Sequence, residues 1–403
     1  MKRELSLWQV SFFLTNLIII IIGLFFVFSS SPMESIATTI EFSTPTVWHY
    51  ILTQLSGVLV GLVLLFIGSR LPKKLYHRYA LLFYIVSLVL LILTLVPGFS
   101  SAQKGGRRWL LLGPLHFQPV EIVKIAAVIF FGRLLSQSPS IWKTLFFLLP
   151  LCFLLERQPD FASCCLLFAG IMGMFFIAGG KWREILGVAS VGLLLVFALI
   201  RFSPYRLERL QTYQIINQEE VDYAALPVEE REKVWHAKQL QISFGRGGLT
   251  GVGLGGSKQK FSYLPEASSD SIFAIVGEEF GFIGVLSIIA LYILYFALGW
   301  RLMDLSDNHF SLKLIGYGLL MVMIFQFLIY LSAISGLIPL TGITLPFFSF
   351  GRTSLASSML ITGIILGLSR HTNFAPEVVE YPDEKDFSTR RPSHARTRSR
   401  RLR

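Results

Sequence analysis

The chain has 403 residues, of which 53% are hydrophobic and 15% are charged. Soluble domains carry roughly 25% charged residues, so this composition excludes a disordered protein and argues against a soluble globular enzyme. Apolar runs of about 20 residues and 35 phenylalanines predict an all-α polytopic membrane protein. The formal net charge of +11 then reflects a bias among the loops, and no nucleic acid is expected as a partner.

Ten apolar segments follow one another along the chain and predict about ten transmembrane helices. Their approximate cores are 8–28, 49–69, 79–97, 119–137, 141–155, 161–178, 184–202, 272–300, 311–335 and 353–369. The first segment is too long for the core of a signal peptide and no A-x-A-like site follows it, so an uncleaved first span is expected. One large connection, 203–271, follows the seventh segment.

The distribution of lysine and arginine predicts the orientation in the membrane. Four cations stand in the 70–78 loop, whereas the opposite loop, 29–48, has none. The positive-inside rule therefore places both termini in the cytoplasm and the 203–271 loop outside. Residues 1–370 then form the membrane domain. The basic tail 371–403 is expected to be disordered in the cytoplasm, with binding to anionic lipid headgroups as the alternative.

Four polar stretches fall on the outer side of this topology. The first begins with cations beside an aromatic residue: Lys104, Arg107, Arg108 and Trp109. Cations on the outer face oppose the positive-inside bias, and an anionic ligand such as a phosphate would compensate for them. Trp109 either contacts this ligand or acts only as an anchor at the membrane interface.

Glu121 and Lys124 stand at the start of the fourth span. They are three positions apart, so they share one helix face and can pair. Ionisable groups within a span are costly and are therefore functional candidates. The alternative is a structural pair whose charges only neutralise each other. A second polar stretch, 156–160, is a tight turn, and local turn chemistry explains its Pro159 and Asp160 but not Arg157 on the outer side.

The third polar stretch, 244–270, is rich in glycine and ends the large loop. Gly251, Gly253 and Gly256 match G-x-G-x-x-G, but no predicted strand precedes them and no βαβ unit surrounds them, so a dinucleotide site is rejected. We expect the glycines to allow a close approach of the backbone to a ligand or to the membrane. The stretch carries three cations of interest: Arg246, Lys258 and Lys260.

Asp270 stands where this loop meets the eighth span. One interpretation is an N-cap carboxylate. Against it, Pro265 is a good first helical residue, and Phe273 leaves no capping box, so a functional carboxylate is favoured. Glu278 and Glu279 follow within the span, and their expected partners are cations on neighbouring helices.

The middle of the large loop, about 205–240, is predicted to form a helix on the outer surface, either as a solvated helix or as a lid over a site. The fourth polar stretch, 336–354, connects the last two spans. It is too apolar for an ordinary loop and too broken by proline and glycine for a helix. Such backbone is tolerated at membrane depth only where protein buries it or where it lines a cavity.

Four signatures together resemble the SEDS family (shape, elongation, division and sporulation). They are GGRRWLLLGPLHFQPVEIVK, ERQPDF, SFGRGGLTGVGLGGSKQKFSYLPEASSDSIFAIVGEEFGFIG and GLIPLTGITLPFFSFGRTSL, which come in the family's order. The resemblance covers about 1–370 and implies a bundle of ten transmembrane helices with a large extracytoplasmic loop after the seventh. Ala267 makes the chain more similar to the FtsW branch than to the RodA branch.

The resemblance implies a peptidoglycan glycosyltransferase that polymerises lipid II into glycan strands on the outer face of the bacterial inner membrane, for septal wall synthesis in cell division. It implies a cognate single-span penicillin-binding transpeptidase, other division proteins and membrane lipids as partners. The family's essential aspartate falls on Asp270, its aromatic residue on Trp109, and its intramembrane pair on Glu121 and Lys124. Asp270 is then the general base, or the ligand of a divalent cation (Mg or Mn) that assists the base.

Such a transferase needs one base near the acceptor hydroxyl and positive charge near the leaving diphosphate. Asp270 supplies the base, while Trp109, Glu121 and Lys124 are expected to bind the substrate. The expected cations are Lys104, Arg107, Arg108, Arg246, Lys258 and Lys260. The chain departs from the family's usual residues at four positions: Val120, Ser271, Phe350 and Arg352.

Two other functions stay open at this point: a transporter that flips the lipid-linked precursor, and a non-catalytic scaffold for a transpeptidase. A transporter needs polar groups accessible from both sides, often near the midplane of the membrane. Here the unusual motifs cluster outside and the inner loops are short, which favours the enzyme. The chain has no recognisable transpeptidase domain, so crosslinking of the strands would require a second protein.

Overall fold

The computed structural model describes residues 2–41, 48–103, 106–112, 115–190, 192, 215, 226–261, 264 and 267–370. Met1–Arg370 forms one compact unit, and the predicted tail, 371–403, lies outside the described residues. The helices are α1 (Lys2–Glu41), α2 (His49–Arg70), α3 (Lys73–Arg78), α4 (Ala80–Leu95), α5 (Pro119–Gln137), α6 (Ile141–Arg157), α7 (Phe161–Ile177), α10 (Val228–Gly247), α11 (Ile272–Leu305), α12 (Phe310–Ile334) and α13 (Arg352–Ser369).

Nine of these helices overlap predicted apolar segments, which confirms a polytopic membrane fold; α3 and α10 lie between segments, and α1 continues to Glu41, into the predicted 29–48 loop. Five of them are long and apolar enough to cross a membrane: α1, α2, α11, α12 and α13. Helical residues 182–190 begin the predicted 184–202 segment, whose remainder is described only at residue 192. The number of ten spans therefore stays a prediction. Local signals set some helix starts, since Pro119 occupies the first turn of α5 and the Asp160 side chain caps α7 by accepting a bond from Ser163 N.

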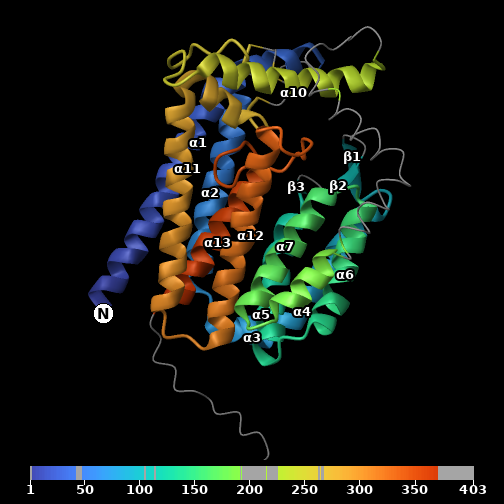
Figure 1. The fold of residues 1–403 in the computed structure, drawn as a ribbon, viewed down its shortest axis with the longest axis vertical. Helices are drawn as coiled ribbons and strands as arrows, with labels where there is room; N and C mark the ends of the chain where they lie inside the picture. The colour runs from blue at the N-terminus through green and yellow to red at the C-terminus, as the bar shows by residue number, and fades with distance from the viewer. Residues whose placement is uncertain are drawn as a thin grey trace, which may run out of the picture. The chain divides into compact units, whose positions relative to one another are not determined.

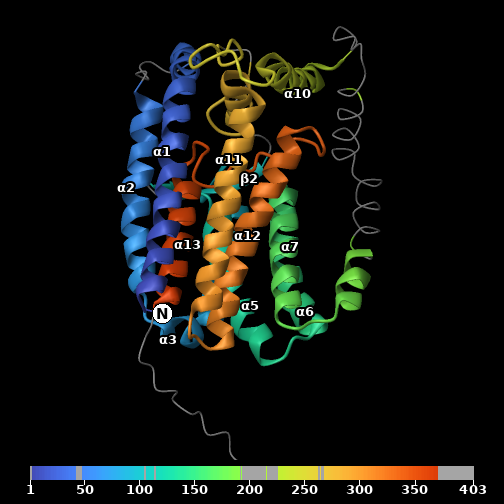
Figure 2. The same cartoon turned by 60° about the vertical axis from the view of Figure 1, so that its left-hand side comes forward.

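α1 and α12 run in one direction through the bundle, and α2, α11 and α13 run in the other (Figure 1). α1 begins at the face where α13 ends, because Gln9 Nε2 donates to Ser369 Oγ at 2.9 Å. The start of α3 lies there too, since Lys73 Nζ donates to the Arg370 carbonyl oxygen at 2.6 Å. α10 lies across the opposite end of the bundle in both views (Figures 1 and 2). We call this opposite end the α10 end. The β-sheet also lies there, as does the non-helical stretch at residues 336–351, which we call the 336–351 segment.

A small antiparallel sheet joins α4 to α5. Its strands are β1 (Ser100–Gln103), β2 (Gly106–Leu112) and β3 (Leu115–Phe117), in the order β1-β2-β3. The all-α prediction did not include it. The pairs Gln103–Gly106 and Leu112–Leu115 leave two-residue connections, and glycines at positions 105 and 113 are typical of such short hairpin turns. Strand β2 carries Arg107, Arg108 and Trp109 of the first cationic stretch.

Helices α2 and α13 approach closely enough for their backbones to touch. A methyl group added at Gly363 would lie 2.2 Å from the Leu65 carbonyl oxygen, and one added at Gly367 would lie 2.8 Å from the Gly68 carbonyl oxygen. Small residues permit this kind of packing between membrane helices. The contact matters for the site because α2 and α13 form two walls of the cavity described below.

We expect Gly363→Ala to destabilise the protein by about 1–3 kcal/mol, because overpacking forces the two backbones apart. The midpoint temperature for loss of the monodisperse protein in detergent should fall accordingly. Gly187→Ala is the matched control, since a methyl group there meets nothing within 4 Å. Equal midpoints for the two variants would contradict a rigid contact between α2 and α13.

Candidate functional site

Asp270 lies immediately before α11 and is half-buried. The N-cap residue of α11 is Ser271, and α11 begins at Ile272. The N-cap interpretation of Asp270 is therefore wrong, and so is the expectation that Pro265 begins this helix. Asp270 therefore stands one position before the N-cap residue of α11. This leaves the functional interpretation in place.

The 336–351 segment lies directly against Asp270. The Phe350 backbone N–H donates to the Ser268 carbonyl oxygen at 2.9 Å. A methyl group added at Gly342 would lie 3.4 Å from Asp270 Oδ2, so the Gly342 backbone faces the carboxylate. Gly342 has a φ of 70°, which glycine adopts without strain. The segment is buried by protein at several positions, as its composition predicted: Leu345, Phe347, Phe348 and Ser349.

Glu121 and Lys124 form a buried ion pair on α5. Lys124 Nζ lies 2.9 Å from Glu121 Oε2, and both residues are less than 5% exposed. The predicted pairing is confirmed. Ser357 Oγ donates to Glu121 Oε2, and Lys124 Nζ donates to Gln326 Oε1 at 2.8 Å. We did not predict Gln326 or Ser357 from the sequence, although a polar residue inside an apolar span is a signal that would have found them.

Two cavities meet at Glu121. One is a polar crevice of about 30 Å³, whose lining includes Arg108, Lys124 and Gly342. The other is a mostly apolar cavity of about 440 Å³ between α2, α4, α5 and α13. Its lining runs from Ser56 to Leu71, which is about 22 Å along a helix and most of the ~30 Å hydrocarbon thickness of a bilayer. The pair therefore stands between a polar site and a space with the length of a lipid chain.

The first cationic stretch contributes Arg108 to the polar crevice. The Arg108 guanidinium donates to the carbonyl oxygens of Gln158, at 3.4 Å, and Pro159. These bonds tie β2 to the turn between α6 and α7. Trp109 is half-buried in β2 opposite Ser101. Lys104 and the Arg107 side chain lie outside the described residues, so their expected roles stay predictions.

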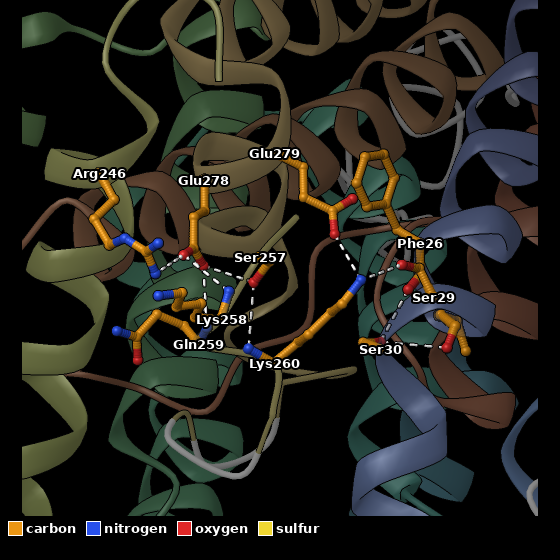
Figure 3. A network of polar contacts seen from close by, with 11 residues as sticks. Phe26, Ser29, Ser30, Arg246, Ser257, Lys258, Gln259, Lys260, Glu278 and Glu279 are labelled. Atoms are coloured by element: carbon orange, nitrogen blue, oxygen red, sulfur yellow. Dashed lines mark hydrogen bonds and ion pairs between the residues drawn. The ribbon is translucent and has the colours of Figure 1, made fainter. Parts of the chain in front are cut away.

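Glu278 is the centre of a polar network at the α10 end (Figure 3). It is fully buried. Arg246 Nη1 lies 2.8 Å from its Oε1, and Ser257 Oγ donates to its Oε2 at 2.6 Å. The backbone N–H groups of Lys258 and Gln259 donate to the same carboxylate at 3.1 and 3.3 Å. One buried carboxylate thus fixes both α10 and the loop at 257–259.

Glu279 reaches the other way, toward α1 (Figure 3). Lys260 Nζ lies 2.8 Å from Glu279 Oε1 and donates to Ser29 Oγ at 3.2 Å. The prediction that both carboxylates pair with cations on neighbouring helices is confirmed for Arg246 on α10 and wrong for Lys260, which lies in the loop. Internal carboxylates balance the charges of Arg246 and Lys260. Their expected contact with substrate, and that of Lys258, stays a prediction.

The glycine-rich loop hydrogen-bonds to carbonyl oxygens of α11 next to a kink in that helix. Gly281 leaves the helical conformation, with φ 64° and ψ −163°. The N–H groups of Val252 and Gly253 bond to the carbonyl oxygens of Glu278 and Glu279 at 2.9 and 3.0 Å. A methyl group at Gly251 would lie 2.1 Å from the Glu279 carbonyl oxygen. The glycines were expected to approach a ligand or the membrane, but Gly251 and Gly253 approach α11.

α10 packs its inner face against the bundle. Val234, Leu240 and Ser243 on this helix are buried, and α10 contacts α11. The expectation of a helix within 205–240 is confirmed for 228–240, and this helix is exposed on one side and packed against the bundle on the other. A helix that is polar all round would have no reason to bury these residues. Whether α10 covers a site as a lid stays a prediction.

The described residues contain no group of three or more His, Cys, Asp or Glu side chains able to hold a metal ion. Divalent cations such as Mg²⁺ are bound by several oxygen ligands. Asp270 alone does not make such a site within the described part of the chain.

The sequence pattern of the cell cycle proteins FtsW, RodA and SpoVE matches residues 9–374. A protein of Trichlorobacter lovleyi named as the probable peptidoglycan glycosyltransferase FtsW is 32% identical over 336 residues, with 81% of this chain and 85% of the relative covered. A relative of the same name from Nitrosococcus halophilus is 33% identical over 376 residues, with 91% and 94% covered.

Solved structures show the same fold. One chain of a peptidoglycan synthase complex, described for its coordination of polymerisation and crosslinking, matches with a TM-score of 0.68 at 23% identity. The match covers 89% of this chain and 96% of that chain. Together with the apolar helices, this likeness supports an integral membrane protein.

Proposed function

The chain belongs to the FtsW, RodA and SpoVE family of cell cycle proteins, and we propose that it is a peptidoglycan glycosyltransferase that polymerises lipid II into glycan strands. One observation carries the proposal. The polar crevice is lined by Gly342, whose backbone faces Asp270. At Glu121 this crevice meets the apolar cavity, which follows α2 for most of a bilayer's thickness. A substrate with a sugar head, a diphosphate and a polyprenyl tail matches this order of environments.

The transfer is a single displacement. A sugar hydroxyl of the acceptor attacks the anomeric carbon of the donor, the carbon–oxygen bond to the polyprenyl diphosphate breaks, and Asp270 takes the proton of the hydroxyl. The diphosphate leaves with the bonding electron pair, and positive charge close to it stabilises the transition state. Arg108 and Lys124 both line the crevice and supply that charge. No covalent intermediate with the protein is needed.

The orientation follows from loop charge. The α10 end faces outward and both termini lie in the cytoplasm, because the connection at 70–78, which includes α3, is basic, whereas 29–48, which includes the end of α1, has no lysine or arginine. Cysteines introduced at Glu230, on α10, and at Ser393, in the tail, should react with a membrane-impermeant reagent from opposite sides. Labelling of both from the same side would disprove this orientation. The resemblance to the division branch supports a location at the septum, and a fluorescent fusion that avoids the septum would contradict that part of the proposal.

A cognate single-span penicillin-binding transpeptidase completes the proposal. Ser257 and Lys260 have the S-x-x-K spacing of an acylating serine, but Ser257 is fully buried and donates to Glu278, while Lys260 pairs with Glu279. This motif is therefore structural, and we propose that a second protein supplies the crosslinking activity. The chain in a solved peptidoglycan synthase complex shares this fold, which supports the partnership.

Reconstitution with purified lipid II tests the function. Glycan strands should form, and co-purified transpeptidase should increase their yield. Movement of labelled lipid II across the bilayer without strands would support the transporter. Neither activity, together with stable binding of the transpeptidase, would support the scaffold. Strand formation that no co-expressed transpeptidase stimulates would count against the partnership alone.

A further inference from the structure

A chain of hydrogen bonds leads from the ion pair on α5 to the backbone of the 336–351 segment. Lys124 Nζ, paired with Glu121, donates to Gln326 Oε1 at 2.8 Å. Gln326 Nε2 in turn donates to the Thr344 carbonyl oxygen at 2.9 Å. Gln326 on α12 is 3% exposed, so its amide has these protein partners in place of water.

The chain closes into a ring through α13. Thr344 Oγ1 shares a hydrogen bond of 2.8 Å with Ser354 Oγ. Ser357 Oγ donates to the Ser354 carbonyl oxygen at 3.0 Å and to Glu121 Oε2. We call this the six-residue ring; its members are Glu121, Lys124, Gln326, Thr344, Ser354 and Ser357. The ring connects α5, α12, the 336–351 segment and α13.

An amide side chain fits the position of Gln326 better than a carboxylate, an ammonium group or an apolar side chain. The side chain must accept a bond from an ammonium group and donate one to a backbone carbonyl at the same time. A carboxylate accepts but cannot donate, and an ammonium donates but cannot accept. An apolar side chain would leave the Lys124 ammonium and the Thr344 carbonyl each without one buried partner, which is costly at this depth.

Side chains from other helices hold the non-helical backbone of the 336–351 segment. The carbonyl oxygens of Thr344, Pro346 and Ser349 accept from Gln326 on α12, Tyr292 on α11 and Gln54 on α2, respectively. Thr344 is two residues from Gly342, whose backbone faces Asp270 Oδ2. Of these three bonds, the one from Gln326 therefore lies closest along the chain to Gly342, the residue that faces Asp270.

We propose that Gln326 is a positioning residue that ties the Glu121–Lys124 pair to the backbone facing Asp270. It fixes the separation between the base and the crevice that holds the diphosphate. The proposal rests on the glycosyltransferase function. A shift of about 1 Å in such a geometry can cost about 100-fold in rate. Loss of the Gln326 bonds should therefore lower kcat and leave the binding of lipid II largely unchanged.

Two substitutions test the role. Gln326→Met keeps the length of the side chain and removes both bonds, while Gln326→Glu keeps the acceptor for Lys124 and removes the donor to Thr344. Both should lower kcat by about 10- to 100-fold and leave the KM for lipid II within about twofold. Gln326→Met should be non-additive with Lys124→Met in kcat, because the two residues share one bond.

Gln54→Met is the matched control. Gln54 also bonds the 336–351 segment, at the Ser349 carbonyl oxygen and the Gly351 N–H, without touching the six-residue ring. Its effect on kcat should add to that of Lys124→Met. Equal coupling for both glutamines, or a wild-type kcat in Gln326→Glu, would overturn the proposal.

Hydrogen exchange gives a readout that does not depend on activity. Gln326→Met should speed exchange in the peptides covering 342–345 while the global unfolding midpoint changes little. Unchanged exchange there would overturn the positioning role even in an inactive preparation. Faster exchange together with a wild-type protein that makes no strands would instead count against the glycosyltransferase function.

Discussion

Asp270→Asn should lower the rate of lipid II polymerisation by about 10²- to 10⁴-fold, the contribution typical of a positioned general base. The amide has almost the size of the carboxylate but cannot take a proton from the acceptor hydroxyl. Folding should be preserved, because Ser271 and not Asp270 is the N-cap residue of α11. The measurement is strand formation by purified protein in detergent or vesicles, beside its unfolding midpoint.

Glu232→Gln is the control for this variant. It makes the same chemical change at an exposed position of α10 and should leave the rate unchanged. A rate in Asp270→Asn that recovers as Mg²⁺ or Mn²⁺ is raised would assign Asp270 the role of a cation ligand. Near wild-type polymerisation by Asp270→Asn without added cation would remove Asp270 from the chemistry.

Spans were predictable from the sequence because length and apolar composition suffice for them. The predicted 353–369 segment matches α13, and the predicted 119–137 segment matches α5. The hydrocarbon layer demands about 20 apolar residues whatever the neighbours are. The three-stranded sheet was not predicted, because its strands are short and their pairing depends on register rather than on composition.

Contacts within one helix were predictable, and contacts between distant segments were not. Glu121 and Lys124 are three residues apart, so helix geometry alone brings them together. Gln326 is 202 positions from Lys124, and only the packing of α5 against α12 reveals that they bond. In the same way, the composition of the glycine-rich loop predicted a close backbone approach but could not identify α11 as its target.

Breaking the Glu121–Lys124 pair is expected to lower the stability of the protein substantially. Lys124→Met leaves Glu121 as a buried carboxylate without its cation, and removing one partner of a buried pair typically costs about 3–5 kcal/mol of stability. Glu121→Gln should cost less, because Ser357 still donates to the remaining amide oxygen and Gln326 still accepts from Lys124. Unfolding midpoints in detergent check this order.

The double variant separates structure from function. Glu121→Gln with Lys124→Met removes both charges, so it should recover much of the stability that Lys124→Met alone loses. Polymerisation should not recover with it, because the crevice still lacks the cation expected to face the diphosphate. Recovery of both stability and rate would mean that the pair only neutralises itself. Plain additivity in both measurements would mean that the two charges are not coupled, despite the 2.9 Å between Lys124 Nζ and Glu121 Oε2.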